Sequence, residues 1–144
     1  MCPHRRRTWL LGFGSLVVCL AATWCFFPRI KKRSPAELRR LATQLVEAAG
    51  GSVQICREAD RVFEMYSTQD YHLLSYAEAT NFTALSRLGN VRGVWFGDPA
   101  YVSVRYGDHL DGVFIQIVPK GSEAAARRRT NWVELIEGRI YVHD

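Results

Sequence analysis

Cysteine is scarce in this chain, and its placement argues against two common kinds of small domain. The four cysteines are Cys2, Cys19, Cys25 and Cys56, and only Cys56 lies beyond the first 33 residues. We therefore predict no internal disulfide in the C-terminal part, and no cysteine or histidine pair has the spacing of a zinc site. A lone cysteine of this kind usually packs as a small hydrophobe, which is what we expect of Cys56.

Sequence motifs of well-known catalytic sites are also missing. There is no phosphate-binding loop, no G-x-S-x-G nucleophile turn and no H-E-x-x-H zinc motif. Asp108, His109 and Asp111 stand close together and would suit acid–base chemistry, but a solvated loop explains them better. We accordingly predict no catalytic residue, no cofactor and no metal site.

Acidic residues are absent from residues 1–33, which contain seven Lys and Arg. Residues 34–144 contain twelve Lys and Arg against fourteen Asp and Glu, a formal excess of two negative charges. The basic character of the chain therefore belongs to its beginning, and we predict no nucleic-acid partner for the remainder. The basic run at 126–129 is interpreted as a solvated helix face, with contact to an acidic lipid or partner as the alternative.

A long run without charge is the clearest feature of the beginning of the chain. The residues from Thr8 to Phe27 read TWLLGFGSLVVCLAATWCFF, with Trp9 and Trp24 near the two ends. As a helix rising about 1.5 Å per residue, this run would span about 30 Å, the thickness of a bilayer's hydrocarbon core. Aromatic residues collect at both interfaces of a membrane. We predict a basic tail over 1–7, a single transmembrane helix over 8–27 and a basic juxtamembrane linker over 28–34.

Three alternatives to a membrane anchor stay open: a cleaved signal peptide, lipidation at Cys19 and a buried soluble helix. The run is long for a signal peptide, and Val18 is larger than the residue that usually precedes a lipidated cysteine. Basic residues flank the run on both sides and give conflicting signals about orientation. The predicted location is a single-pass membrane protein, with the side of its C-terminal domain left open.

Residues 35–144 are predicted to form one small domain, of α/β or α+β class. Ser34, Pro35 and Glu37 suit the start of a helix that Gly50 and Gly51 would end. Alternating apolar residues in SVQIC (52–56) and RVFEMYS (61–67) favour two strands. Further along, the patterns favour an irregular helix near 71–79, a helix from Asn81 to Gly89, strands at 91–97 and 112–117, a helix at 122–129 and two final strands.

The stretch LSRLGNVRGVWF, residues 85–96, changes its apolar period from three to two. Its spacing resembles the leucine-rich repeat, and residues 104–115 repeat four of the five apolar positions nineteen residues later. The resemblance is to short, degenerate repeat proteins of bacteria. It implies that residues 35–144 form a leucine-rich-repeat-like α/β domain with parallel strands at 91–97 and 112–117. An ordinary α+β domain whose helix–strand junction matches by chance is the alternative.

Side chains that alternate away from the buried positions are candidates for a binding surface. If Val94 and Phe96 face inward, strand alternation aims Trp95 at the opposite face. In leucine-rich repeats that sheet face binds partners, and exposed aromatic residues and arginines are common in interfaces. The alternative is that the helix at 35–49 covers this face. The candidate partner-binding residues are Arg92, Trp95, Asp111, Phe114 and Gln116.

Together these patterns predict a membrane-anchored protein-interaction module that binds a protein partner and has no catalytic activity. Two other classes stay open, a small membrane-tethered enzyme and a structural subunit of a membrane complex.

Overall fold

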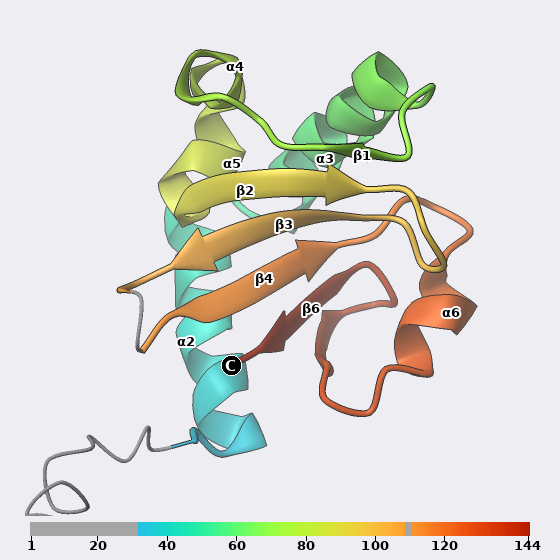
Figure 1. Cartoon of the computed structure of the whole chain (residues 1–144). Helices are drawn as coiled ribbons and strands as arrows, with labels where there is room; N and C mark the ends of the chain where they lie inside the picture. Colours follow the sequence, from blue (N-terminus) through green and yellow to red (C-terminus); the bar gives the residue numbers. More distant parts are fainter. Residues whose placement is uncertain (1–31, 109–110) are drawn as a thin grey trace, which may run out of the picture. The chain divides into compact units, whose positions relative to one another are not determined.

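A six-stranded antiparallel sheet, covered by helices on one face, organises the unit Lys32–Asp144 in the computed structural model (Figure 1). The structure describes residues 32–108 and 111–144. The sheet order is β1-β2-β3-β4-β6-β5, and every neighbouring pair is antiparallel. The helices are α2 (Pro35–Ala48), α3 (Ser52–Tyr66), α4 (Tyr76–Thr80), α5 (Thr83–Leu88) and α6 (Glu123–Arg127). The strands are β1 (Tyr71–His72), β2 (Asn90–Trp95), β3 (Tyr101–Tyr106), β4 (Val113–Ile117), β5 (Val133–Ile136) and β6 (Ile140–His143).

The predicted first helix is confirmed, together with its start signal. The Ser34 side chain accepts a hydrogen bond from the Glu37 backbone N–H, and the Glu37 carboxylate accepts one from the Ser34 N–H at 2.8 Å. This reciprocal capping box satisfies two donors that the first helical turn leaves free. The face of α2 that carries Leu38, Ala42 and Val46 is buried.

The two strands predicted at 52–56 and 61–67 are wrong, because one helix, α3, runs through both segments. Its buried apolar residues follow helical spacing, at Ile55, Ala59, Val62 and Tyr66. Val53, whose alternation with Ile55 had favoured a strand, is 73% exposed. Five residues of alternation are compatible with either period, and the longer helical stripe decides between them.

The change of period near residue 89 does mark the passage from a helix to a strand. Leu85 and Leu88 are buried on α5, and Val91 and Val94 are buried on β2. The predicted cap at Asn81 is wrong. Helix α5 begins at Thr83, and the residue before it forms no side-chain capping hydrogen bond. Glu58 of α3 caps the helix instead. Its carboxylate accepts hydrogen bonds from the backbone N–H groups of Ala84 at 3.1 Å and Leu85 at 3.0 Å.

The predicted leucine-rich-repeat fold with parallel strands is contradicted. Strands β2 and β4 are not neighbours, because β3 lies between them and pairs antiparallel with both. The stretch YVSVRY, which a repeat would place on its convex side, alternates as a strand that buries Val102 and Val104. A short connection joins β2 to β3, which only antiparallel strands allow. The unit is therefore α+β. The similar apolar spacing of residues 85–96 and 104–115 does not reflect two turns of a solenoid.

The structure does not support the predicted transmembrane helix or the predicted single-pass membrane location. Among the helices of residues 32–108 and 111–144, none is both long and apolar enough to cross a bilayer. The predicted span 8–27 and the tail 1–7 lie outside the described residues.

Helices α2, α3 and α5 pack on the same face of the sheet, and α2 passes behind the strands in Figure 1. On that face, Val94, Val102, Ile115 and Val142 are fully buried. On the opposite face, which we call the outer face, the short helix α6 near β6 is the one helix among the described residues. The predicted alternative that the helix at 35–49 covers the candidate binding residues is therefore wrong, since α2 lies on the other side of the sheet.

Candidate partner-binding face

Strand alternation places aromatic and polar side chains on the outer face. Trp95 lies opposite Tyr71 on one side and Tyr101 on the other, and Phe114 lies between Arg105 and His143. Pairs that face each other across antiparallel strands share a face of the sheet. By this register the outer face includes Tyr71, Asn90, Gly93, Trp95, Tyr101, Ser103, Arg105, Phe114, Gln116, Glu134, Tyr141 and His143.

One end of the outer face is open to solvent and built around Trp95. The ring centroids of Tyr71 and Trp95 lie 6.0 Å apart, and those of Trp95 and Tyr101 lie 6.5 Å apart. Tyr71 is 53% exposed and Trp95 is 41% exposed. Two glycines make room for these rings. A Cβ at Gly93 would come within 2.9 Å of the Tyr71 hydroxyl, and a Cβ at Gly97 would collide with the Trp95 indole.

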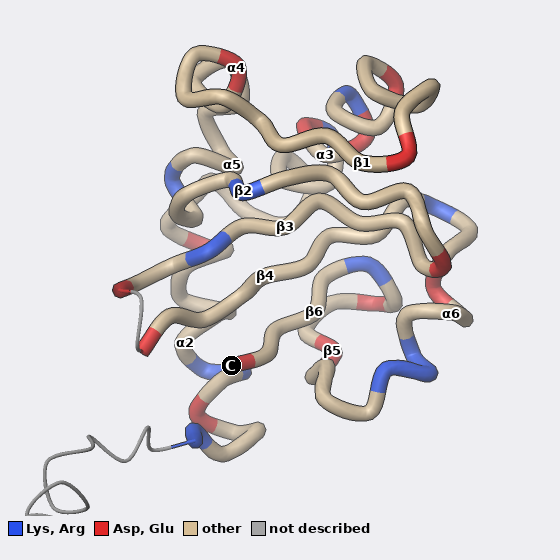
Figure 2. Tube along the Cα trace, viewed as in Figure 1, with Lys and Arg blue, Asp and Glu red and all other residues tan. Residues whose placement is uncertain are grey.

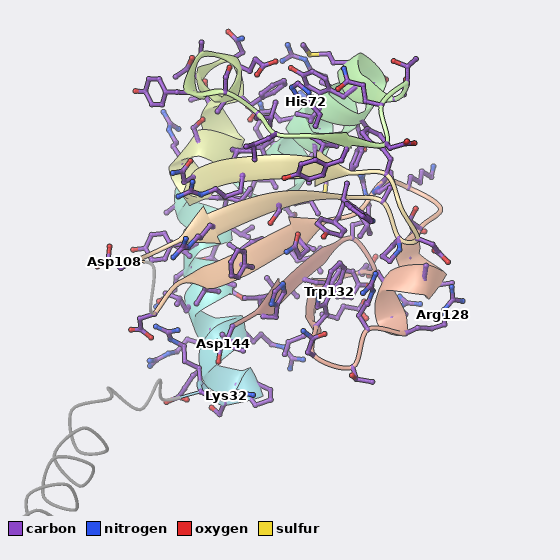
Figure 3. The ribbon with its side chains drawn as sticks, in the orientation of Figure 1. Lys32, His72, Asp108, Arg128, Trp132 and Asp144 are labelled. Atoms are coloured by element: carbon purple, nitrogen blue, oxygen red, sulfur yellow. The ribbon has the colours of Figure 1, made fainter. Side chains whose placement is uncertain are left out.

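The centre of the outer face is occupied by Trp132, which lies just before β5. Its ring lies 5.5 Å from that of Tyr101, 5.6 Å from Tyr141 and 6.0 Å from His143, measured between centroids. His143 in turn stacks on Phe114 at 5.2 Å. Figure 3 shows Trp132 between β6 and α6, on the side of the sheet away from α2. The rings of the outer face therefore form a continuous row, all within the range in which aromatic pairs attract.

Gln116, which lies among these rings, is a polar side chain that is buried in the sheet. It is 4% exposed, and its side-chain Nε2 lies 3.1 Å from Nε2 of His143. The other ring nitrogen of His143, Nδ1, faces the backbone oxygen of Asp144 at 3.0 Å and must be the donor there. In neutral His143, Nε2 is then the acceptor of the Gln116 amide hydrogen. This leaves Oε1 of Gln116 buried, with no hydrogen-bond partner among the described residues.

Arginines surround the aromatic row. The guanidinium of Arg105 lies 5.8 Å from the Phe114 ring centroid, and that of Arg129 lies 5.8 Å from the Trp132 ring centroid. Arg129 also donates to the backbone oxygen of Asp98 at 3.2 Å. Burial raises the pKa of the Tyr101 and Tyr141 phenols, so both rings stay neutral. Figure 2 shows few charges along the middle strands, with basic positions on β2, β3 and the segment after α6.

The structure brings together three of the five predicted binding residues. Trp95, Phe114 and Gln116 all belong to the outer face. Arg92 is exposed, lies at a register irregularity of β2 and lines a small hollow of about 260 Å³ beside Tyr76. Asp111 is exposed in the connection between β3 and β4 and pairs with Arg33 at 2.9 Å.

Five rings of the face escaped the sequence analysis: Tyr71, Tyr101, Trp132, Tyr141 and His143. For Tyr101 a signal was available, because the alternation of YVSVRY directs Tyr101 to the face of the strand away from Val102 and Val104. Tyr71, Tyr141 and His143 lie on strands of two or four residues, too short for a period to be read. Trp132 lies outside any strand, so no periodicity places it on a face.

A second hollow, between α3 and the β5–β6 turn, has a volume of about 580 Å³ and is lined by Cys56, Asp60 and Arg139. Arg139 donates to both carboxylate oxygens of Asp60 and to the Val118 backbone oxygen. Burial raises the pKa of the Cys56 thiol, which favours the unreactive protonated form. Acidic and basic side chains alternate along this hollow, so its charges do not select a ligand.

Asp108, His109 and Asp111, for which the sequence favours a solvated loop over acid–base chemistry, do not form a described site. His109 lies outside the described residues, and the Asp108 backbone oxygen accepts a hydrogen bond from the Arg105 guanidinium at 2.6 Å. Within the described part of the chain, no group of His, Cys, Asp and Glu is arranged to hold a metal ion.

A polar network at the junction of α3, β1 and α4 is structural. Glu78 accepts hydrogen bonds from the Tyr66 hydroxyl at 2.7 Å and from the Ser75 backbone N–H at 2.7 Å, and His72 Nε2 lies 3.1 Å from it. Hydrogen bonds from Ser75, then from Tyr66, lower the pKa of the Glu78 carboxyl to about 2. Burial and the bond to Glu78 raise the pKa of Tyr66 to about 12. Each member already has a partner within the network.

Comparison of the chain with protein-family models, curated proteins and solved structures finds no match in any of the three.

Proposed function

We propose that this chain is a non-catalytic binding module whose outer face docks a segment of a protein partner. The observation that carries the proposal is the continuous row of rings from Tyr71 to Phe114, open to solvent at Trp95. Large aromatic side chains that a fold leaves exposed, beside arginines, have the composition of interface hot spots.

The geometry of the row supports a role in docking, because its exposed rings are held in place before any partner arrives. Trp95 lies between Tyr71 and Tyr101 and against Gly97. A preorganised aromatic side chain loses little conformational freedom when a partner covers it. The exposed end of the row is therefore the expected hot spot, and Trp95 its central residue.

Charge supports a protein partner rather than a nucleic acid. Residues 34–144 carry twelve basic and fourteen acidic side chains, whereas contacts with phosphate dominate nucleic-acid affinity. Locally the row is basic, since Arg129 lies over Trp132 and forms no ion pair among the described residues. The partner segment is therefore expected to combine apolar or aromatic side chains with flanking carboxylates.

The test is a selection of peptides from a random display library on the immobilised full-length chain. Enriched peptides would be synthesised and titrated calorimetrically against wild type, Trp95→Ala and Tyr76→Ala. Tyr76 is the matched control, because it is an aromatic residue on α4, 88% exposed and outside the aromatic row. We expect Trp95→Ala to weaken binding by about 2 kcal/mol, or about thirtyfold, and Tyr76→Ala to leave it within about twofold.

Two results would overturn the proposed function. One is a library selection that enriches no peptide. The other is a set of enriched peptides that bind Trp95→Ala as tightly as they bind wild type.

A further inference from the structure

We infer that Gln116 is the polar anchor of the docking face, and that its side-chain oxygen accepts a hydrogen bond from a tyrosine or tryptophan side chain of the partner. This inference rests on the proposed function and adds the chemistry of the group that the partner inserts. It starts from the unpartnered Oε1 of Gln116, described above. A buried carbonyl oxygen without a donor destabilises a protein by about 1–3 kcal/mol, so a fold retains one only with a reason.

The described residues do not supply the missing donor. Ser103 lies directly opposite Gln116 on β3, yet the two side chains form no hydrogen bond. The amide cannot simply turn over either, because its Nε2 faces the acceptor nitrogen of His143. Rotating the amide would present an oxygen to that acceptor and leave the amide hydrogens buried instead. The oxygen is therefore held in position by the Gln116–His143 contact.

Aromatic surroundings select a ring as the inserted group. Phe114 and His143 stack on one another next to Gln116, and Trp132 lies against both His143 and Tyr141. Planar groups pack against such rings better than branched aliphatic ones, and tyrosine and tryptophan each combine a ring with one polar hydrogen. A phenylalanine would fill the same space and leave the Gln116 oxygen without a donor.

Charge excludes the other common ligands of aromatic sites. A lysine or a methylated ammonium group would meet Arg105 over Phe114 and Arg129 over Trp132, which repel it. A carboxylate placed at Gln116 would face another oxygen and offer no hydrogen. The inserted group is therefore neutral, while carboxylates on either side of it would be attracted by the surrounding arginines.

Because Oε1 of Gln116 is buried, the partner's ring reaches it only if a neighbouring side chain moves, and we assign this movement to Trp132, which packs on His143 and Tyr141 beside Gln116. Within the described part of the chain, the Trp132 side chain makes ring contacts but no hydrogen bond. It lies between α6 and β5 rather than on a strand. The indole can therefore turn outward without breaking a hydrogen bond, although it leaves the Arg129 guanidinium, and it can pack on the other side of the incoming ring.

Two peptides that differ by one oxygen test the inference. N-acetyl-Glu-Tyr-Glu-amide and N-acetyl-Glu-Phe-Glu-amide would be titrated into the full-length chain labelled with 5-fluorotryptophan and followed by fluorine NMR. The Trp132 resonance would be assigned with Trp132→Phe. We expect the tyrosine peptide to bind about tenfold more tightly and to shift the Trp132 resonance. In Gln116→Met, which keeps the side-chain length but removes the carbonyl, we expect the preference to vanish.

Ser103→Ala is the matched control, since it changes the neighbouring polar residue on the same face and should preserve the tenfold preference. Equal affinities in wild type, or no binding of either peptide at millimolar concentration, would overturn the inference. Because the comparison of the two peptides on wild type decides this, a poorly folded Gln116→Met variant leaves the test intact. The library selection and Trp95→Ala judge the proposed function separately, so that proposal can survive the failure of this one.

Discussion

Trp95 and Tyr101 stack their rings 6.5 Å apart on the outer face, while Val94 and Val102, the adjacent pair on the same strands, are fully buried on the opposite face. Neighbouring residues of β2 and β3 therefore have different roles on the two faces of the sheet. The valines hold the sheet to its helices, and the aromatic residues present a surface to solvent. Substitutions on the two faces should therefore have different consequences.

Trp95→Ala should lower the free energy of unfolding by only about 1 kcal/mol, because the indole is partly exposed and leaves no buried cavity. Ile115→Ala, a fully buried substitution on the helix face, should lower it by about 2–5 kcal/mol. Urea denaturation of the full-length variants, followed by circular dichroism, measures both. A loss for Trp95→Ala as large as that for Ile115→Ala would show that Trp95 belongs to the core.

Gly97→Ala should impair binding through Trp95. The new methyl group would collide with the indole and displace it from its place beside Tyr101. We expect affinity for an enriched peptide to fall by about tenfold, since a misplaced hot spot loses most of its contribution. The double variant Gly97→Ala/Trp95→Ala should bind no more weakly than Trp95→Ala alone, because residues in contact do not act additively. Additive losses would contradict this explanation.

Glu58→Ala should destabilise the fold by about 3 kcal/mol, because two backbone N–H groups at the start of α5 lose their buried acceptor. Glu58→Gln should cost less, since one amide oxygen can still accept. Glu64→Ala, an exposed substitution on the same helix, is the control and should change little. If Glu58→Ala unfolds at the same urea concentration as wild type, the carboxylate is not the cap of α5.

Acid should remove the stabilisation that Glu78 provides. Its pKa is lowered from 4.5 to about 2 in the fold, first by the Ser75 side chain, then by the Ser75 backbone and Tyr66. A carboxyl with a lowered pKa stabilises the fold fully above its unfolded value, and this contribution is lost as the pH falls through the folded value. The stability difference between wild type and Glu78→Gln should therefore be constant above about pH 4.5 and shrink toward about pH 2. A difference that does not change between these values would contradict the assigned role of Glu78.

Some local signals in the sequence located elements, but the short alternating runs at 52–56 and 61–67 wrongly predicted two strands where α3 lies, and long-range pairing was predicted poorly. The capping box at Ser34 and Glu37 located α2 because both partners lie within one helical turn. The apolar spacing from Leu85 to Val94 located a helix–strand junction, but it carries no information about which strand pairs with which. That choice depends on YVSVRY, whose alternation makes β3 the neighbour of both β2 and β4.

The candidate site divides in the same way. Strand alternation predicted that Trp95 on one strand, and Phe114 and Gln116 on another, face away from buried neighbours, and β3 between them places all three on one face. Trp132 could not, since its place depends on how the segment after α6 crosses the sheet. The Gln116–His143 contact joins residues 27 positions apart, and no sequence pattern connects them.

The most direct test of the docking face is the position at which an enriched peptide contacts the full-length chain. Amide and aromatic chemical shifts of the isotopically labelled protein, recorded during a titration, report that position. The account predicts that the largest changes fall on Tyr71, Trp95, Tyr101 and Trp132, with α2 and α3 unaffected. Changes confined to α3 and the hollow beside Cys56, with Trp95 unmoved, would contradict it.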